Sequence, residues 1–253
     1  VGLSVKYMGL HELLMLVPLG ALAGLAMAAL VGLIMARYRE VFFAMLNLAF
    51  SMILFGLLLK LYWLTGGTDG LAIGTATLFG TEIEGDSVGF YYFSLAIVAI
   101  VAFVVCHFMA SPLGYFLRAL YDNEIRIEYS GVAVRQVVYR TYLLAGTLGG
   151  LSGVLAAVNI GHIVPEDAFW IQSGEFVFVA LLGGFGGIPG PLMGAFVFEF
   201  VQAYASKYFP LAWQMTLGII MLIVILFKPG GLWAIYQQVE IWLTRKRRGG
   251  GDG

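Results

Sequence analysis

Few residues in this sequence could carry out chemistry, and their spacing does not build a catalytic or metal site. The three histidines, His11, His107 and His162, lie far apart and lack the short spacing of metal ligands, and Cys106 is the single cysteine. An intramembrane enzyme would need clustered histidines or acids within its spans, and the sequence offers no such cluster. We therefore expect no metal, no cofactor and no catalysis by this chain.

Three polar residues inside apolar runs are candidates for a translocation path. Glu199 stands between pairs of phenylalanine and valine residues, and an ionisable group at membrane depth is costly and suggests a function. Asn47 and Asn159 can form hydrogen bonds across helices. The alternative for each of the three is a role in helix packing, with Gln202 as a partner for Glu199.

Composition sets the class of protein to which these residues belong. Hydrophobic residues make up 60% of the 253 residues and charged residues 11%, with a mean hydropathy of +0.91. Soluble domains have about 45–50% apolar and about 25% charged residues, so the chain is predicted to be a membrane protein. The net charge of −1 provides no basic surface for a nucleic-acid partner.

The apolar segments predict an all-α, polytopic membrane helical bundle with about seven spans. A spanning helix needs about 20 mostly apolar residues. The predicted spans are 12–36, 41–63, 90–110, 141–160, 174–187, 190–206 and 211–228. The fifth and sixth are short, and the alternative for them is a re-entrant pair buried in protein.

The basic residues predict how the spans are oriented. If the 37–40 loop, the 111–140 segment, the 183–191 turn and the C-terminus face the cytoplasm, every Lys and Arg lies on that side except Lys6, Lys60 and Lys207. This distribution follows the positive-inside rule. We therefore expect a multi-pass protein of the prokaryotic cytoplasmic membrane, in contact with lipid, with its C-terminus in the cytoplasm.

Small residues recur every three or four positions on two of the predicted spans. Helices in lipid associate closely where small side chains let their backbones approach. The pattern predicts helix packing, and the alternative is a pore lining or a subunit interface. The residues are Gly20, Gly24, Ala28 and Gly32 on the first span, and Gly146, Gly149 or Gly150, Gly153 and Ala157 on the fourth.

Residues 111–140 form the one long polar insertion on the basic side. Ser111-Pro112 is an N-cap followed by a proline at the first helical position, and Gly131 suits the position after a helix end. A short amphipathic helix is expected between them, with Leu117, Leu120, Tyr121, Ile125 and Tyr129 on one face. Its mixed charge favours a cytoplasmic protein partner over anionic lipid.

This segment and three others resemble a known family. Arg118-Ala119-Leu120-Tyr121-Asp122-Asn123-Glu124 with Glu128 and Gly131 is similar to the coupling loop of permease subunits of branched-chain amino acid ABC transporters. Three more motifs agree in order, and the likeness is greatest to the M-type permease. They are Thr65-Gly66-Gly67-Thr68-Asp69-Gly70-Leu71, the glycine-rich run 181–194, and Phe227-Lys228-Pro229-Gly230-Gly231-Leu232.

The resemblance implies a set of partners and roles. The partners are a second, related permease subunit, two cytoplasmic ATP-binding subunits and an extracytoplasmic solute-binding protein. Arg118, Asp122, Asn123, Glu124, Glu128 and Gly131 would couple to the ATPase, and residues Thr65, Gly66, Gly67, Thr68, Asp69 and Gly70 would dock the binding protein or act as a gate. ATP hydrolysis would then belong to the partners.

The sequence departs from the family pattern at Tyr121, where a basic residue is usual, and is bulkier at residues 126–130. The family's first helices are expected to precede Val1. We predict a permease domain over 1–235, containing the 111–140 coupling loop, and a cytoplasmic tail over 236–253. The transported solute is expected to be a branched-chain amino acid or a related small polar solute, such as another hydrophobic amino acid, an amide or urea. An autonomous secondary transporter or channel is the alternative.

Overall fold

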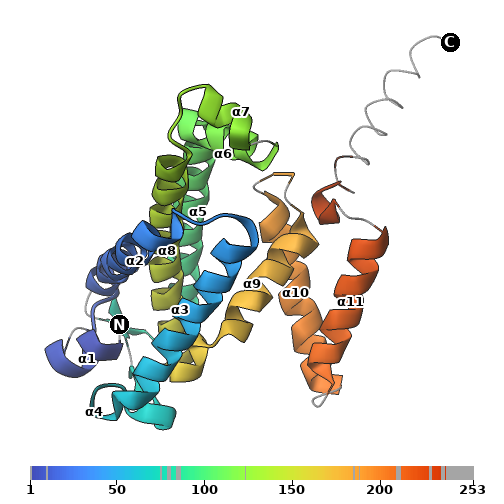
Figure 1. Cartoon of the computed structure of the whole chain (residues 1–253). Helices are drawn as coiled ribbons and strands as arrows, with labels where there is room; N and C mark the ends of the chain where they lie inside the picture. Colours follow the sequence, from blue (N-terminus) through green and yellow to red (C-terminus); the bar gives the residue numbers. More distant parts are fainter. Residues whose placement is uncertain are drawn as a thin grey trace. The chain divides into compact units, whose positions relative to one another are not determined.

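The computed structural model describes residues 2–9, 11–74, 76–78, 81–83, 87–122, 124–184, 186–187, 189–208, 212–227, 230–234 and 237. In these residues the chain is mostly helical (Figure 1). It also has two short two-stranded sheets. Contacts divide the chain into unit 1, Val1–Trp170, and unit 2, Ile171–Gly253, and each unit is described by itself.

The elements of unit 1 are α1 (Gly2–Met8), α2 (Leu13–Met35), α3 (Glu40–Lys60), α4 (Tyr62–Thr65), η1 (Gly67–Asp69), β1 (Leu71–Ala72), β2 (Ala76–Leu78), β3 (Thr81–Ile83), α5 (Val88–Ala110), α6 (Pro112–Asp122), α7 (Glu124–Tyr129), α8 (Val134–Ile160), β4 (His162–Ile163) and η2 (Pro165–Ala168). Helix α9 (Trp170–Gly183) begins at the boundary between the units. Unit 2 continues with α10 (Pro189–Tyr208) and α11 (Trp213–Phe227).

Four helices in the described part of the chain, α2, α3, α5 and α8, are long and apolar enough to cross a membrane. They match the first four predicted spans, and α9, α10 and α11 match the other three, which confirms a polytopic helical bundle. Several boundaries differ from the prediction, most of all at the starts of α8 and α9. Residues 134–140, assigned to the polar loop, form the first turns of α8, and α9 starts at Trp170 rather than at residue 174.

In the described residues α2 and α8 pack against each other extensively, and glycines make this close contact possible. A Cβ atom at Gly24 would collide with the carbonyl oxygen of Gly146, and one at Gly150 would collide with that of Gly20. Gly149 faces open space, so Gly150 is the member of that pair that packs against α2. The predicted small-residue faces are thus confirmed as a helix-packing contact between α2 and α8, which we call the glycine seam. The prediction is wrong at Gly153, where a Cβ atom would have no heavy atom within 4 Å.

One end of unit 1 is closed by the connection between α4 and α5. Strand β1 pairs with β4 in an antiparallel register that sets Leu71 opposite Ile163. Ile73 and Ala76, which follow β1, are 2% exposed and join two buried clusters with residues of α2 and α8. This connection is therefore part of the core of unit 1.

Unit 2 is built around a tight hairpin of α9 and α10. A Cβ at Gly183 would collide with the carbonyl oxygen of Gly190, and one at Gly194 with that of Val179. Gly184, whose φ is +89°, lies against Gly230 and Gly231. The glycine-rich run and the C-terminal motif, separate in the sequence, thus pack together, above a core that includes Leu182, Phe198 and Leu217.

The glycine seam gives a matched test. Gly150→Ala places a methyl group against the backbone of α2, and we expect it to destabilise the protein by about 1–3 kcal/mol, as overpacking does. Gly149→Ala adds the same methyl one residue away, where space is open, and gains about 1 kcal/mol of helix propensity. Thermal unfolding in detergent micelles measures both variants; equal stability of the two would contradict the seam.

Candidate functional site

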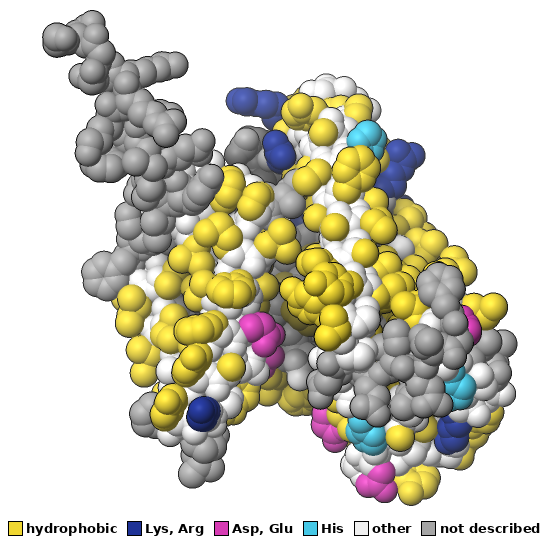
Figure 2. Space-filling model, turned by 180° about the vertical axis from the view of Figure 1, so that it is seen from behind, with side chains coloured by type: hydrophobic (Ala, Val, Ile, Leu, Met, Phe, Trp, Pro, Cys, Tyr) yellow, Lys and Arg dark blue, Asp and Glu magenta, His cyan; other side chains and the backbone are white. Residues whose placement is uncertain are grey.

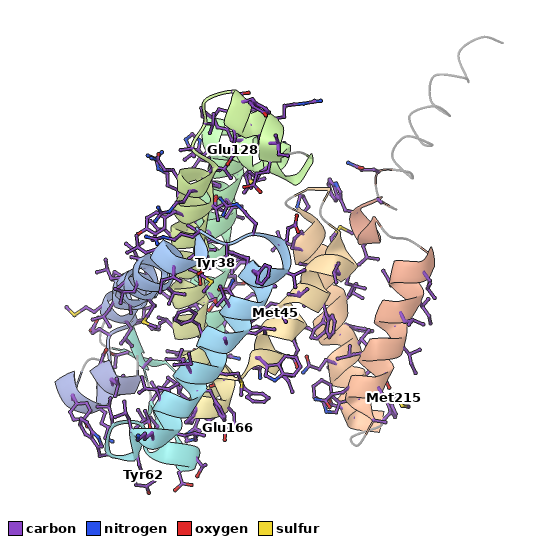
Figure 3. The ribbon with its side chains drawn as sticks, in the orientation of Figure 1. Tyr38, Met45, Tyr62, Glu128, Glu166 and Met215 are labelled. Atoms are coloured by element: carbon purple, nitrogen blue, oxygen red, sulfur yellow. The ribbon has the colours of Figure 1, made fainter. Side chains whose placement is uncertain are left out.

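Unit 1 has two ends of different chemical character. The α2–α3 connection, α6 and α7 lie at one end with several arginines, which we call the arginine end. The opposite end carries α4, β1, β4 and η2, and Figure 3 shows Tyr62 and Glu166 there, away from Glu128. In Figure 2 hydrophobic side chains cover the helices between these ends. Basic residues at the arginine end are Arg37, Arg39, Arg118, Arg126, Arg135 and Arg140.

The predicted caps of the coupling segment are confirmed. The Ser111 side chain accepts a hydrogen bond from the backbone N–H of Gly114 at 3.4 Å, and Pro112 is the first residue of α6. Gly131, two residues beyond α7, has a φ of +80°, and its N–H donates to the carbonyl oxygen of Glu128 at 2.9 Å. The segment is thereby held at both ends, between α5 and α8.

The predicted apolar face of this segment is wrong at two of its residues. The structure describes α6 and α7, and residue 123 between them lies outside the described residues. In α7 the buried apolar residue is Ile127, whereas Ile125 and Tyr129 are 63% and 89% exposed. Ile125 and Tyr129 thus share an exposed side of α7, and the fold, not the spacing, shows which side is buried.

An ion pair joins the α2–α3 connection to the start of α7. The Arg39 Nε atom lies 2.6 Å from the Glu124 Oε1 atom. The Arg39 Nη1 atom also donates to the carbonyl oxygens of Ala36 at 2.8 Å and Tyr38 at 2.9 Å. The sequence predicts that both loops lie on the cytoplasmic side, but it did not predict this pair. The available signal was that the two loops carry opposite charges on the same side of the membrane.

Two of the remaining predicted coupling residues are exposed, and two lie wholly or partly outside the described residues. Arg118 and Glu128 are exposed at the arginine end. The side chain of Asp122 and all of Asn123 lie outside the described residues. A cavity of about 340 Å³ opens at this same end, between the last turn of α2 and the first turns of α8. Its lining includes Leu33, Arg135 and Tyr139.

The predicted docking or gate residues form a turn at the opposite end. The Oγ1 atom of Thr65, a buried residue, lies 2.7 Å from the carbonyl oxygen of Leu58 and accepts a hydrogen bond from the N–H of Gly67 at 3.3 Å. Gly66, Gly67 and Gly70 all have positive φ. These four residues shape the turn, and Thr68 and Asp69 are the two members whose side chains are exposed.

The three path candidates occupy different environments. Asn47 accepts a hydrogen bond from the Tyr142 hydroxyl at 2.9 Å and donates to the carbonyl oxygen of Phe43, so it links α3 to α8. Asn159 is exposed and lines a cavity between α5 and α8. Glu199 is exposed on α10 and interacts electrostatically with Glu175 of α9.

Long apolar helices, glycine-mediated packing and charges gathered at the helix ends define a multi-pass α-helical membrane protein. The family model of the branched-chain amino acid transport system permease component matches residues 1–226. The chain belongs to this family. No solved structure matches the chain.

Relatives with curated names agree with this family. The chain is 27% identical over 238 residues to the high-affinity branched-chain amino acid transport system permease protein LivM of Escherichia coli (strain K12), with 85% of this chain and 56% of LivM covered. A probable LivM of Methanocaldococcus jannaschii is 26% identical, covering 88% and 69%. The permease protein LivH of Salmonella typhimurium is 27% identical, covering 67% and 52%. The chain thus spans about half the length of the bacterial relatives.

The Arg39–Glu124 ion pair can be tested by exchanging its charges. Arg39→Glu and Glu124→Lys should each destabilise the protein, and the double variant should recover part of the loss. Because both side chains are partly exposed, at 28% and 34%, the coupling energy is expected to be about 0.5–1 kcal/mol.

Denaturant unfolding of the four proteins in micelles, at low and high salt, measures this coupling energy. High salt should reduce it, because mobile ions screen the pair. Strict additivity of the two single variants at low salt would contradict the contact.

Proposed function

We propose that this chain is the permease subunit of an ATP-driven importer for branched-chain amino acids or a related small polar solute. It provides the membrane passage and does not hydrolyse ATP. A second permease subunit, two cytoplasmic ATP-binding subunits and an extracytoplasmic solute-binding protein complete the transporter. The observation that carries the proposal is the α6–α7 segment, held on unit 1 at the arginine end, within a chain of the permease family.

The proposed coupling surface is the exposed side of this segment. Arg118 on α6 and Glu128 and Tyr129 on α7 are exposed, and Tyr129 is 89% exposed. An exposed aromatic residue among charges of both signs suits a protein partner, since aromatic and arginine side chains are enriched at interfaces. Anionic lipid, by contrast, would repel Glu128.

The segment has two connections through which force can pass to the spans. Ile127 of α7 is 6% exposed, and α7 packs against α8. Through Glu124, α7 also holds Arg39, which lies between α2 and α3. Movement of α7 by a nucleotide-driven partner would therefore act on α2, α3 and α8 together.

The distribution of charge supports a cytoplasmic location for the arginine end. Positively charged residues in short loops favour the cytoplasmic side. The opposite end of unit 1 has Glu12, Asp69, Glu166 and Asp167 beside two lysines. In this orientation the exposed Thr68 and Asp69 face outward and are available to the solute-binding protein. The predicted C-terminal tail, over 236–253, falls outside the described residues apart from residue 237, and we propose that it lies in the cytoplasm.

Transport by the reconstituted complex tests the function. Proteoliposomes holding this chain, its second permease and the ATP-binding subunits should take up L-leucine with the binding protein and ATP. Glu128→Lys should weaken ATPase attachment about tenfold or more, the effect of about 1.4 kcal/mol. Uptake and co-purification of the ATP-binding subunits are the measurements.

Glu166→Lys is the matched control, because it reverses the same charge at the opposite end of unit 1 (Figure 3). It should leave ATPase attachment unchanged. Uptake by this chain without ATP or the ATP-binding subunits would instead support a secondary transporter or channel, and normal attachment in Glu128→Lys would remove Glu128 from the coupling surface.

Cysteine labelling tests the orientation. In a Cys106→Ala background, Arg118→Cys should react with a membrane-impermeant maleimide only after the cytoplasmic face is opened to the reagent. Asp69→Cys should react in intact cells or right-side-out vesicles. The reversed pattern would refute the proposed orientation and, with it, ATPase coupling through α6 and α7.

A further inference from the structure

Helix α8 has a second face of small residues, distinct from the glycine seam. Positions three or four apart share a helix face, and on this face they are Ala145, Gly149, Ser152, Gly153 and Ala156. All five are exposed, and a Cβ atom at Gly149 or Gly153 would have no heavy atom within 4 Å. The face is therefore open within the described part of the chain.

This face differs from the other exposed faces of the spans in unit 1. Helices α2, α3 and α5 expose large hydrophobic side chains such as Leu22, Phe42 and Phe103, which are 64%, 70% and 73% exposed. Ile160, the last residue, is the one large hydrophobic side chain that is exposed on α8 in the structure as described. A face that contacts lipid tails is expected to resemble those of α2, α3 and α5. The small residues on the open face of α8 instead indicate contact with something other than lipid.

A cavity of about 330 Å³ lies at one end of this face, between α5 and α8. Ala156 belongs both to the open face and to the cavity wall. The Ser94 hydroxyl oxygen, on a residue that lines the cavity, is buried and has no hydrogen-bond partner in the described residues. The full lining is Phe90, Tyr91, Ser94, Leu155, Ala156 and Asn159.

The chemistry of this lining is two-sided. Phe90 is 5% exposed, and Leu155 packs against its buried cluster, which gives an apolar wall. Ser94 and Asn159 provide a hydroxyl and an amide. Buried polar groups in native proteins nearly always have a hydrogen-bond partner. The unpaired Ser94 hydroxyl therefore indicates that a polar ligand binds in this cavity. The volume falls at the lower end of the range for small-molecule sites.

We propose that the cavity between α5 and α8 binds the transported solute, a small amphipathic molecule. Ser94 and Asn159 hydrogen-bond its polar end, and Phe90 and Leu155 contact its apolar part. The cavity lies near the first residues of α5 and the last of α8, at the end of unit 1 opposite the arginines, so it is the first binding site after entry from outside. The open face of α8 continues from it and leaves room for the solute along the helix. This inference rests on the proposed function.

Single-cysteine labelling of the full chain in proteoliposomes tests the site, without ATPases or transport. In a Cys106→Ala background, Ala156→Cys should react with an impermeant, cationic methanethiosulfonate at least about tenfold faster than Leu95→Cys, because the reactive thiolate forms in a hydrated site and not in lipid. Leu95 is the matched control, since it is exposed on α5 and follows Ser94 directly in the sequence. L-Leucine or isovaleramide, added in excess, should slow the reaction of Ala156→Cys and leave Leu95→Cys unchanged.

Further variants separate the possible outcomes. Asn159→Leu in the Ala156→Cys protein should preserve labelling and remove protection. Equal, slow labelling at residues 156 and 95 would show that lipid fills the cavity and would overturn the proposal. Labelling that disappears when the second permease is present, irrespective of solute, would show a subunit interface and also overturn it. Protection by isovaleramide but not by L-leucine would keep the site and refute branched-chain amino acids as the solute.

Discussion

Lipid tails are as apolar as the side chains that meet them, so the hydrophobic effect does little to hold one spanning helix against another. Close backbone contact must supply that attraction instead. The seam between α2 and α8 meets this requirement with Gly20, Gly24, Gly146 and Gly150, where any added side chain would strike a carbonyl oxygen or the facing helix. The other parts of unit 1 are arranged around this pair. The connection between α4 and α5 closes one end, and α6 and α7 pack at the other.

The seam also determines how the two ends of unit 1 communicate. Interlocked backbones cannot slide past one another without collision, so α2 and α8 are expected to move as a single body. Helix α8 has 27 residues and is about 40 Å long, which is enough to join the arginine end to the cavity beside Asn159. In the proposed function, a displacement of α7 at one end would therefore change the surroundings of the solute at the other.

Much of this architecture could be predicted from the sequence, because the length of an apolar segment and the residues that start or end a helix are local properties. The spans, the Ser111-Pro112 cap and the turn at Gly131 are of this kind. Spacing shows which residues share a helix face but not what faces them, so it could not choose between Gly149 and Gly150. The Arg39–Glu124 pair, the burial of Ile73 and the contact of Gly184 with Gly230 depend on segments far apart in the chain. The path candidates were also ambiguous, since only the fold distinguishes the paired Asn47 from Asn159 in a cavity.

Helix α9 makes membrane thickness relevant to this protein. Its 14 residues give a length of about 21 Å, against about 30 Å for the hydrocarbon core of a bilayer. Its first turn contains Gln172 and Ser173, which shortens the apolar part further. Hydrophobic mismatch of this size costs a fraction of a kcal/mol per Å and is relieved where acyl chains thin around the helix. In the predicted arrangement, in which α9 crosses the bilayer, lipids with short or disordered tails would reduce the deformation energy at α9, and the surrounding bilayer would affect the stability of unit 2.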